Sequence, residues 1–101
     1  EEKHINAAVK VMTTLNKYAA EKAAKYSINS CTDVTGFGLL GHALEMAAGS
    51  KVTIHILSMD IPFVEGAKEY AKMGLIPAGT YRNKKYAQKD IKLLIEEDYR
   101  L

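Results

Sequence analysis

The stretch that decides the fold is CTDVTGFGLLGH, residues Cys31–His42. The run INSCTDV at 28–34 is short and partly β-branched, and small polar residues bound it, which is typical of a strand. A tight turn containing Gly36 and Gly38 follows, and the apolar spacing of GFGLLGHALEMAA then predicts a helix over 36–48. The stretch therefore predicts a strand, a glycine turn and a helix in succession.

Outside this stretch, hydrophobic periodicity predicts further elements on both sides. An apolar stripe at helical spacing predicts a helix over 3–26, and the alternation in KVTIHIL predicts a strand over 51–57. A third helix is expected over 63–73, an ordered loop over 76–89, and either a strand or a helix over 90–101. The expected fold class is therefore α+β: a small mixed sheet with helices packed on it, like an α/β sandwich.

Composition limits the classes of protein. The 101 residues allow one domain at most, and 48% hydrophobic with 26% charged residues excludes a disordered chain. A net charge of +2 is too small to indicate nucleic-acid binding, and no apolar run approaches the about 20 residues of a membrane span. The single cysteine excludes a disulfide framework and fits the cytoplasm. Because EEKHINAAVK has neither an initiator methionine nor a signal peptide, we expect a piece of a longer protein.

The glycine turn carries the chemistry. Asp33 would lie at the end of the strand, and the first turn of the helix presents N–H groups that favour an anion such as phosphate. An aspartate beside a phosphate suits Mg²⁺, which prefers oxygen ligands and bridges to phosphate oxygens. Thr35, Gly36 and Gly38 would then shape the anion pocket, because glycine allows a close approach of backbone to ligand. From spacing alone, the commoner explanation is structural: Asp33 or Thr35 caps the helix, and the glycines allow close packing of helix on strand.

The same residues resemble a known family. CTDVTGFGLLGH, followed by Glu45-Met46, closely resembles selenophosphate synthetase (selenide, water dikinase), in the superfamily of aminoimidazole ribonucleotide synthetase. Leu15-Asn16-Lys17, Glu65-Gly66-Ala67 and the stretch 79–83 extend the resemblance through nearly the whole chain. The resemblance implies that residues 1–101 are a partial C-terminal domain of an enzyme that makes selenophosphate, AMP and phosphate from ATP, selenide and water.

The resemblance also implies roles for residues and partners. Asp33 would be a Mg²⁺ ligand, and an N-terminal domain absent here would supply most of the ATP site and the homodimer contact. No catalytic residue falls in this stretch, so we expect the piece alone to be inactive, and Cys31 does not inherit the family's reactive cysteine or selenocysteine. Two departures are Ala78, where the family usually has glycine, and the absence of a later Asp-Pro-Gln-Thr-Ser-Gly-Gly segment. The alternatives are another ATP-dependent synthetase or kinase of the superfamily, or a non-catalytic binding domain.

Several other polar residues have structural explanations. His42 and Glu45 are three residues apart on the expected helix and predict a polar surface pair, whereas Cys31 predicts a small buried residue on a strand. Asn83 belongs to the expected loop and is placed near the site by the resemblance. His4 carries no signal. The basic residues of the expected loop predict a solvated surface: Arg82, Lys84, Lys85 and Lys89.

Overall fold

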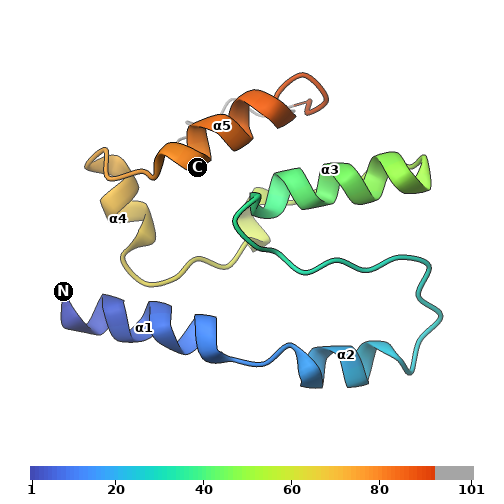
Figure 1. Ribbon diagram of the computed structural model, residues 1–101, viewed down its shortest axis with the longest axis horizontal. Coiled ribbons are helices and arrows are strands. Elements are labelled where there is room, and N and C mark those ends of the chain that lie inside the picture. The colour runs from blue at the N-terminus through green and yellow to red at the C-terminus, as the bar shows by residue number, and fades with distance from the viewer. Residues whose placement is uncertain (93–101) are drawn as a thin grey trace.

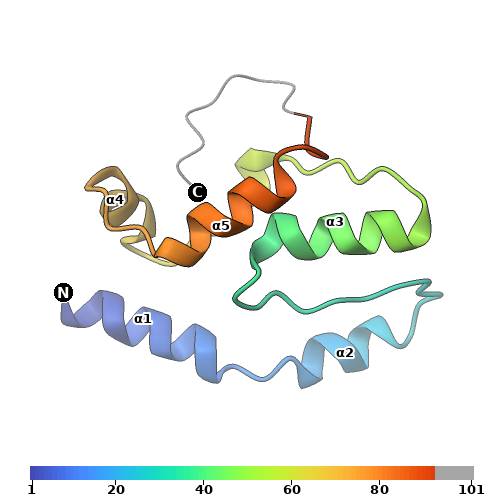
Figure 2. The same ribbon diagram turned by 45° about the horizontal axis from the view of Figure 1, so that its top comes forward.

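The computed structural model describes residues 1–92, and its regular elements are all helices. They are α1 (Glu2–Thr13), α2 (Lys17–Ala23), α3 (Gly38–Ser50), the 3₁₀ turn η1 (Ser58–Asp60), α4 (Ala67–Lys72) and α5 (Ala78–Ala87). Helices α1 and α2 follow one another along one side, and α5 meets α3 near the start of α3 (Figure 1 and Figure 2). Among the described helices, α3 and α5 are the pair whose backbones approach each other closely.

The expected α+β fold is wrong for the described residues, which contain no strand and no sheet. Segments 28–34 and 51–57 run without regular structure. Outside the helices, the backbone hydrogen bonds of residues 1–92 join residues at most five apart, so neither segment has a ladder. The physical reason is that a strand exists only when a neighbour accepts and donates its backbone hydrogen bonds. Alternation of apolar residues predicts which side chains would share one face of a strand, but it does not supply the neighbouring strand.

The single helix expected over 3–26 is two helices with a break at residues 14–16. The Thr13 hydroxyl donates to the Val9 carbonyl at 2.8 Å, and the Thr14 hydroxyl donates to the Lys10 carbonyl at 2.6 Å. Thr14 leaves the helix with φ −72° and ψ 122°. Threonine hydroxyls that bond the preceding turn compete with the helical backbone bonds, and threonine has a low helix propensity. Two consecutive threonines therefore end α1.

The loop expected over 76–89 is largely helix α5. Pro77 precedes the helix with φ −58° and ψ 141°, which places the helix start at Ala78. Ala87, in the last turn, is 2% exposed. Contacts with α3 therefore outweigh the turn-forming residues in this segment. Of the ambiguous stretch 90–101, residues 93–101 lie outside the described part.

The two other expected helices are confirmed with shifted bounds. Helix α3 begins two residues later and ends two residues later than the expected 36–48. Helix α4 is shorter than the expected 63–73, because Gly66 has φ +84° and α4 begins only after it. A left-handed residue cannot continue a right-handed helix, so Gly66 fixes the start of α4.

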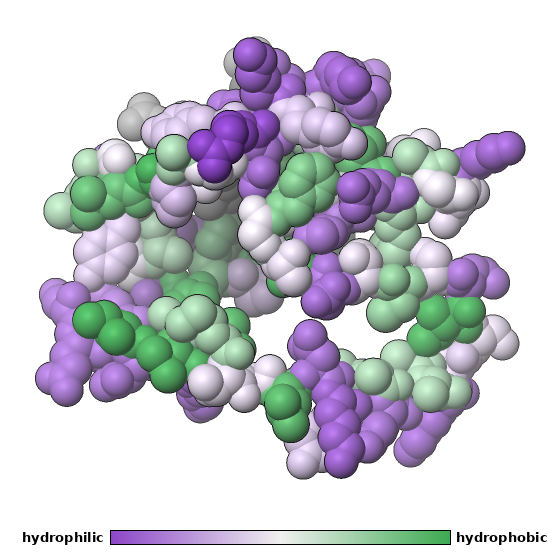
Figure 3. Space-filling model, viewed as in Figure 1, coloured by the Kyte–Doolittle hydropathy of each residue, from purple (hydrophilic) through white to green (hydrophobic). Residues whose placement is uncertain are grey.

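Little apolar surface is buried within the described residues. Ala87 is the one buried hydrophobic side chain among them, whereas Met12, Leu15 and Met59 are 75%, 67% and 92% exposed. The Cα radius of gyration is 15.2 Å, against about 13 Å for a compact domain of this length. Figure 3 shows an opening between the lower helices and the rest of the molecule. Packing is therefore concentrated where α5 meets the start of α3.

Candidate functional site

The glycine turn lies immediately before α3, as the sequence predicts. Asp33 and Thr35 are exposed on the irregular segment that leads into the helix. The Gly38 N–H donates to the Thr35 carbonyl at 2.9 Å, and Gly38 has φ +82°. Glycine reaches this conformation without a steric penalty, so Gly38 is required by the backbone of the turn.

The expected capping of this helix by Asp33 or Thr35 is wrong. Phe37 is the N-cap residue of α3, and no side chain makes a capping hydrogen bond there. The Thr35 hydroxyl contacts His42 instead, and Thr32 donates to the Asp33 carbonyl at 2.9 Å. Helix α3 thus starts without a side-chain acceptor for its first amides, which have no partners within the helix.

Helix α5 holds the turn from the other side. The Asn83 Nδ2 donates to the Gly36 carbonyl at 2.8 Å, a contact between residues 47 apart. The same nitrogen would lie 3.8 Å from a Cβ on Gly38, which is an ordinary contact. A Cβ on Gly36 would meet nothing within 4 Å, so close packing does not explain that glycine. Asn83, which the sequence placed only loosely near the site, therefore anchors the turn directly.

An aromatic cluster connects the same elements. The Phe37 ring lies 5.0 Å from the Tyr86 ring of α5 and 5.5 Å from the His42 ring, with an interplanar angle of 82° to the latter. Gly41 makes room for Phe37, because a Cβ there would lie 2.7 Å from the ring. Edge-to-face ring contacts add directional stability to apolar burial. Phe37 thus joins the turn, α3 and α5.

His42 and Glu45 form the expected pair, but His42 also contacts the glycine turn. His42 Nδ1 lies 3.9 Å from Glu45 Oε2, and His42 Nε2 lies 3.1 Å from the Thr35 hydroxyl oxygen. The His42 side chain is 15% exposed, so it is less a surface residue than the sequence suggests. The contact with Thr35 escaped the sequence analysis. No periodic signal could have found it, because Thr35 lies before the start of α3 and helical spacing does not extend to it.

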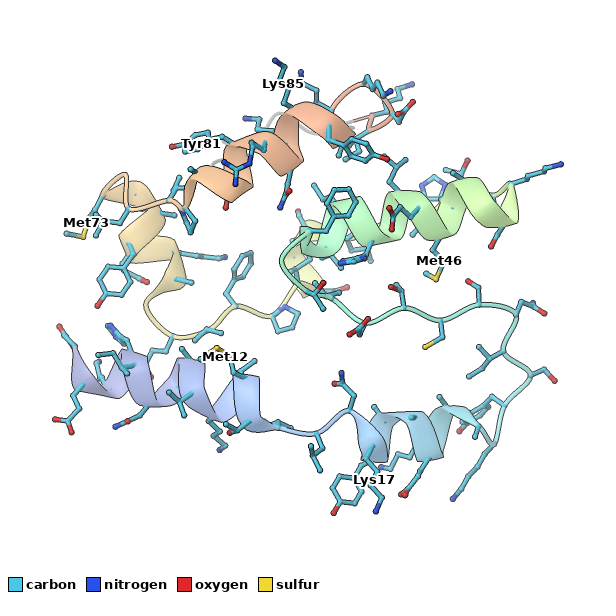
Figure 4. The ribbon with its side chains drawn as sticks, in the orientation of Figure 1. Met12, Lys17, Met46, Met73, Tyr81 and Lys85 are labelled. Atoms are coloured by element: carbon cyan, nitrogen blue, oxygen red, sulfur yellow. The ribbon has the colours of Figure 1, made fainter. Side chains whose placement is uncertain are left out.

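A hollow of about 450 Å³ is lined in part by His42 and Glu45. Cys31 and Met46 are among its lining residues, and Met46 points from α3 toward the preceding segment (Figure 4). Cys31 is exposed, so the expectation of a buried strand residue is wrong. The physical reason is the missing sheet, which leaves nothing to cover this segment.

The basic residues of the segment 82–89 are exposed. Figure 4 shows Tyr81 and Lys85 pointing away from the rest of the molecule. Arg82, Lys84 and Lys89 are also exposed, in agreement with a solvated surface. The amide of Asn83, in contrast, reaches the glycine turn.

Asp33 could contribute one ligand to a cation, but the described residues provide no complete set of ligands around it. No group of three or more histidine, cysteine, aspartate or glutamate side chains could hold a metal ion within residues 1–92. A complete set of protein ligands is not required for Mg²⁺, because this ion is commonly held by one or two carboxylates together with substrate phosphates and water. One exposed carboxylate, five residues before a helix start without a side-chain cap, fits that pattern as a single contributed ligand. In the part of the chain that the structure describes, no helix is long and apolar enough to cross a membrane.

Comparison with known proteins agrees with the resemblance seen in the glycine turn. Residues 2–82 match the family described as AIR synthase related protein, C-terminal domain. The chain is 61% identical over 83 residues to selenide, water dikinase 2 of Peptoclostridium acidaminophilum, which covers 82% of this chain and 24% of that protein. It is 56% identical over 91 residues to selenide, water dikinase of Caldanaerobacter subterraneus subsp. tengcongensis, covering 90% of this chain and 26% of that protein.

A third relative is selenide, water dikinase of Clostridioides difficile, 52% identical over 94 residues, or 92% of this chain and 27% of that protein. The chain thus spans about a quarter of the length of the curated relatives it matches. No solved structure matches it. The chain belongs to the family of the AIR synthase related protein C-terminal domain, and most of its length is similar to part of the selenide, water dikinases.

Proposed function

We propose that this chain is the partial C-terminal domain of an ATP-dependent selenophosphate synthetase. The enzyme makes selenophosphate, AMP and phosphate from ATP, selenide and water. The observation that carries the proposal is the 61% identity to a selenide, water dikinase, together with an exposed aspartate just before an uncapped helix start. The reaction belongs to the whole enzyme, of which this chain supplies one part of the nucleotide site.

Asp33 is the metal ligand of this part. Its exposed carboxylate precedes α3 by five residues and makes no capping bond with the helix. A magnesium ion bound there with ATP would neutralise charge on the phosphates, which is the main requirement of phosphoryl transfer. The role of Asp33 is to hold and orient the Mg²⁺–ATP complex.

Thr35, Gly36 and Gly38 shape the phosphate side of the pocket. The positive φ of Gly38 gives the backbone the turn that leads into α3. The open space beside Gly36 allows a ligand to approach the backbone. The first amides of α3 have no side-chain cap and carry the partial positive charge of the helix start. Together these groups favour an anion next to the cation held by Asp33.

The described residues are insufficient for catalysis alone. A single carboxylate cannot hold the cations and triphosphate that such a transfer needs. We therefore propose that the rest of the enzyme, an N-terminal domain, supplies further acidic residues, the reactive group and the homodimer contact. Selenide, ATP and Mg²⁺ are the proposed partners of the intact enzyme, in the cytoplasm.

The experiment that tests the proposal uses the full-length protein. It is incubated with ATP, Mg²⁺ and selenide, and the products are followed by phosphorus NMR for the wild type and Asp33→Asn. We expect AMP, phosphate and selenophosphate to form only when selenide is present. Asp33→Asn should lower the rate on the order of 100-fold, because charge stabilisation of the phosphates is lost. The matched control is Asp60→Asn, an exposed aspartate of η1, which should leave the rate unchanged.

The other outcomes separate the alternatives. AMP formation that survives Asp33→Asn would remove the metal role and keep the enzyme class. ADP formation with another acceptor would assign the chain to a different synthetase or kinase of the superfamily. No turnover of ATP by the wild type would favour a non-catalytic binding domain.

A further inference from the structure

We propose that His42 is a positioning residue that fixes the Thr35 hydroxyl at the ATP site, and that Glu45 orients the His42 ring. This inference rests on the proposed function, because it gives Thr35 a task only if Mg²⁺–ATP binds at the glycine turn. The observation behind it is a chain of three side chains that ends in the motif itself. Their atoms lie 3.1 Å apart between His42 and Thr35 and 3.9 Å apart between His42 and Glu45.

The His42 ring is held in place from several sides. It lies edge-on to the Phe37 ring at 5.5 Å, and only 15% of the side chain is exposed. Phe37 is itself packed against Tyr86 of α5 and against the backbone at Gly41. Because the ring cannot swing freely, its Nε2 atom offers Thr35 a hydrogen-bond partner at a fixed point. A positioned partner of this kind reduces the freedom that a binding side chain would otherwise lose on contact with its ligand.

Glu45 favours one ring tautomer through its charge, because 3.9 Å is beyond hydrogen-bond distance. Its carboxylate faces Nδ1, and a negative charge there favours a proton on that atom. Nε2 then has a free lone pair and accepts the hydrogen bond of the Thr35 hydroxyl. With its proton directed at His42, the Thr35 oxygen meets a ligand as an acceptor. As an acceptor, the Thr35 oxygen would contact water molecules around Mg²⁺–ATP on the phosphate side of the pocket, because it cannot donate to a phosphate oxygen. The first amides of α3 would donate to the phosphate oxygens.

The test is a double-mutant cycle in the full-length protein. The single variants are Thr35→Val, which removes the hydroxyl at constant shape, and His42→Leu, which removes the ring nitrogens. Each should raise KM for Mg²⁺–ATP by about tenfold, the effect of one hydrogen bond, with a smaller change in kcat. In the Thr35→Val background, His42→Leu should have no further effect on KM, because both variants remove the same interaction. His42→Gln, whose amide can occupy the place of Nε2, should recover most of the affinity.

A second measurement does not depend on turnover. Nitrogen-15 NMR of the histidine side chains should show His42 as the tautomer protonated at Nδ1. Thr35→Val should shift its Nε2 signal, and Glu45→Gln, at an exposed site that leaves packing intact, should move the population toward the other tautomer. The matched control is His4→Leu, a histidine of similar burial far from the turn along the chain. Any loss of activity that His4→Leu causes should match the loss of folded protein, and the KM of the folded enzyme should stay unchanged.

Each outcome decides between the hypotheses. Additive effects of Thr35→Val and His42→Leu on KM, or a His42 signal insensitive to Thr35→Val, would overturn the positioning role. An equal KM increase from His4→Leu would also overturn it, because the effect would then be one of general packing. A wild type that forms no AMP from ATP and selenide would refute the proposed function, while the NMR signals would still decide whether His42 holds Thr35.

Discussion

Two histidines in different regions of the molecule have almost the same surroundings. His4 of α1 and His42 of α3 are 17% and 15% exposed. Each contacts a hydroxyl through one nitrogen, Nδ1 in His4 and Nε2 in His42, and faces glutamate through the other, although His4 also lies 4.0 Å from a second glutamate, Glu1. The hydroxyl oxygens lie 2.8 and 3.1 Å from the rings, and the carboxylates lie 3.8 and 3.9 Å away. The partners are Tyr70 and Glu65 for His4, and Thr35 and Glu45 for His42.

A glycine makes room for a ring in both regions. A Cβ on Gly66 would lie 2.7 Å from the His4 ring, and a Cβ on Gly41 would lie 2.7 Å from the Phe37 ring that packs on His42. His4 also meets Tyr70 edge-on at 5.4 Å, much as His42 meets Phe37. Both regions therefore use the absent side chain of glycine to seat an aromatic ring against backbone.

The difference lies in what each hydroxyl belongs to. Tyr70 is 66 residues from His4, so their contact joins α1 to the distant helix α4. Thr35 is seven residues from His42 and belongs to the glycine turn that carries Asp33. The His4–Tyr70 contact holds two helices together, and the His42–Thr35 contact positions a side chain of the glycine turn. Similar contacts around two histidines therefore do not imply similar roles, and the role is indicated by the segment to which the contacted hydroxyl belongs.

The largest expected effect comes from filling the two glycine positions. Gly66→Ala should lower the free energy of unfolding by about 3 kcal/mol, because it combines a strained φ of +84° with a clash against His4. Gly41→Ala should cost less, about 1 kcal/mol, because alanine favours the helix and the Phe37 ring can shift. Urea unfolding of the full-length protein measures both.

The two variants should differ in their effect on KM. Gly41→Ala should raise KM for Mg²⁺–ATP, because moving Phe37 disturbs His42, whereas Gly66→Ala should leave KM of the folded enzyme unchanged. The matched control is Gly49→Ala in α3, where a Cβ meets nothing and which should raise stability by about 1 kcal/mol. Equal KM values for the two clashing variants would break the distinction between the two histidine regions.

The local geometry of the candidate site could be predicted from the sequence, while the roles of its residues stay a prediction. The order Asp33, glycine turn, helix is present as expected, because a positive-φ glycine followed by helical apolar spacing is encoded locally. The Asn83 contact and the His4–Tyr70 contact could not be predicted, since each joins residues 47 or 66 positions apart. Local pattern carries no information about which distant side chain arrives at a given carbonyl or hydroxyl.

The fold was predicted less well, for two separate physical reasons. The segment 76–89 contains Gly79, Thr80 and Asn83, which favour turns, but contact with α3 stabilises it as a helix. The segments 28–34 and 51–57 have the composition of strands, but no backbone partner within the described residues pairs with them. Tertiary contact overrides local propensity in the first case, and its absence leaves propensity unexpressed in the second.

A smaller effect is expected at the anchor between α5 and the glycine turn. Asn83→Ala should cost about 1 kcal/mol of stability and raise KM for Mg²⁺–ATP severalfold, because the 2.8 Å bond to the Gly36 carbonyl is lost. Asn83→Asp has nearly the same shape but places an oxygen against that carbonyl, so it should be worse than alanine. Unfolding and steady-state kinetics of both variants check this order.

The matched control for the Asn83–Gly36 bond is the contact between His4 and Tyr70. Tyr70→Phe removes the hydroxyl that lies 2.8 Å from His4 and should cost a similar free energy without raising KM. If Asn83→Asp were no worse than Asn83→Ala, the amide would not be donating to Gly36. If Tyr70→Phe raised KM as much as either Asn83 variant, the α1–α4 contact would have to be counted as part of the site.

The smallest expected effect is the pH dependence of the His4 region. A hydrogen bond from Lys3 at 3.0 Å, together with the charge of its ammonium group, holds the pKa of Glu65 below its usual value. A carboxylate whose folded-state pKa is depressed stabilises the fold above its unfolded pKa, and that contribution is lost as the pH falls through the folded-state pKa. Because the pair is exposed, its contribution is small and salt should weaken it.

Carbon-13 NMR titration of the Glu65 carboxyl tests this directly. The midpoint should lie below the ordinary glutamate value in the wild type and rise toward it in Lys3→Gln and in 1 M salt. Lys10→Gln, which removes a lysine from the same helix away from Glu65, should leave the midpoint in place. A midpoint that stays depressed in Lys3→Gln would move the cause to the charge of His4, which is a weaker influence on the pKa of Glu65 than Lys3. The His4 region would then depend on its histidine electrostatically, and its likeness to the His42 region would extend from geometry to charge.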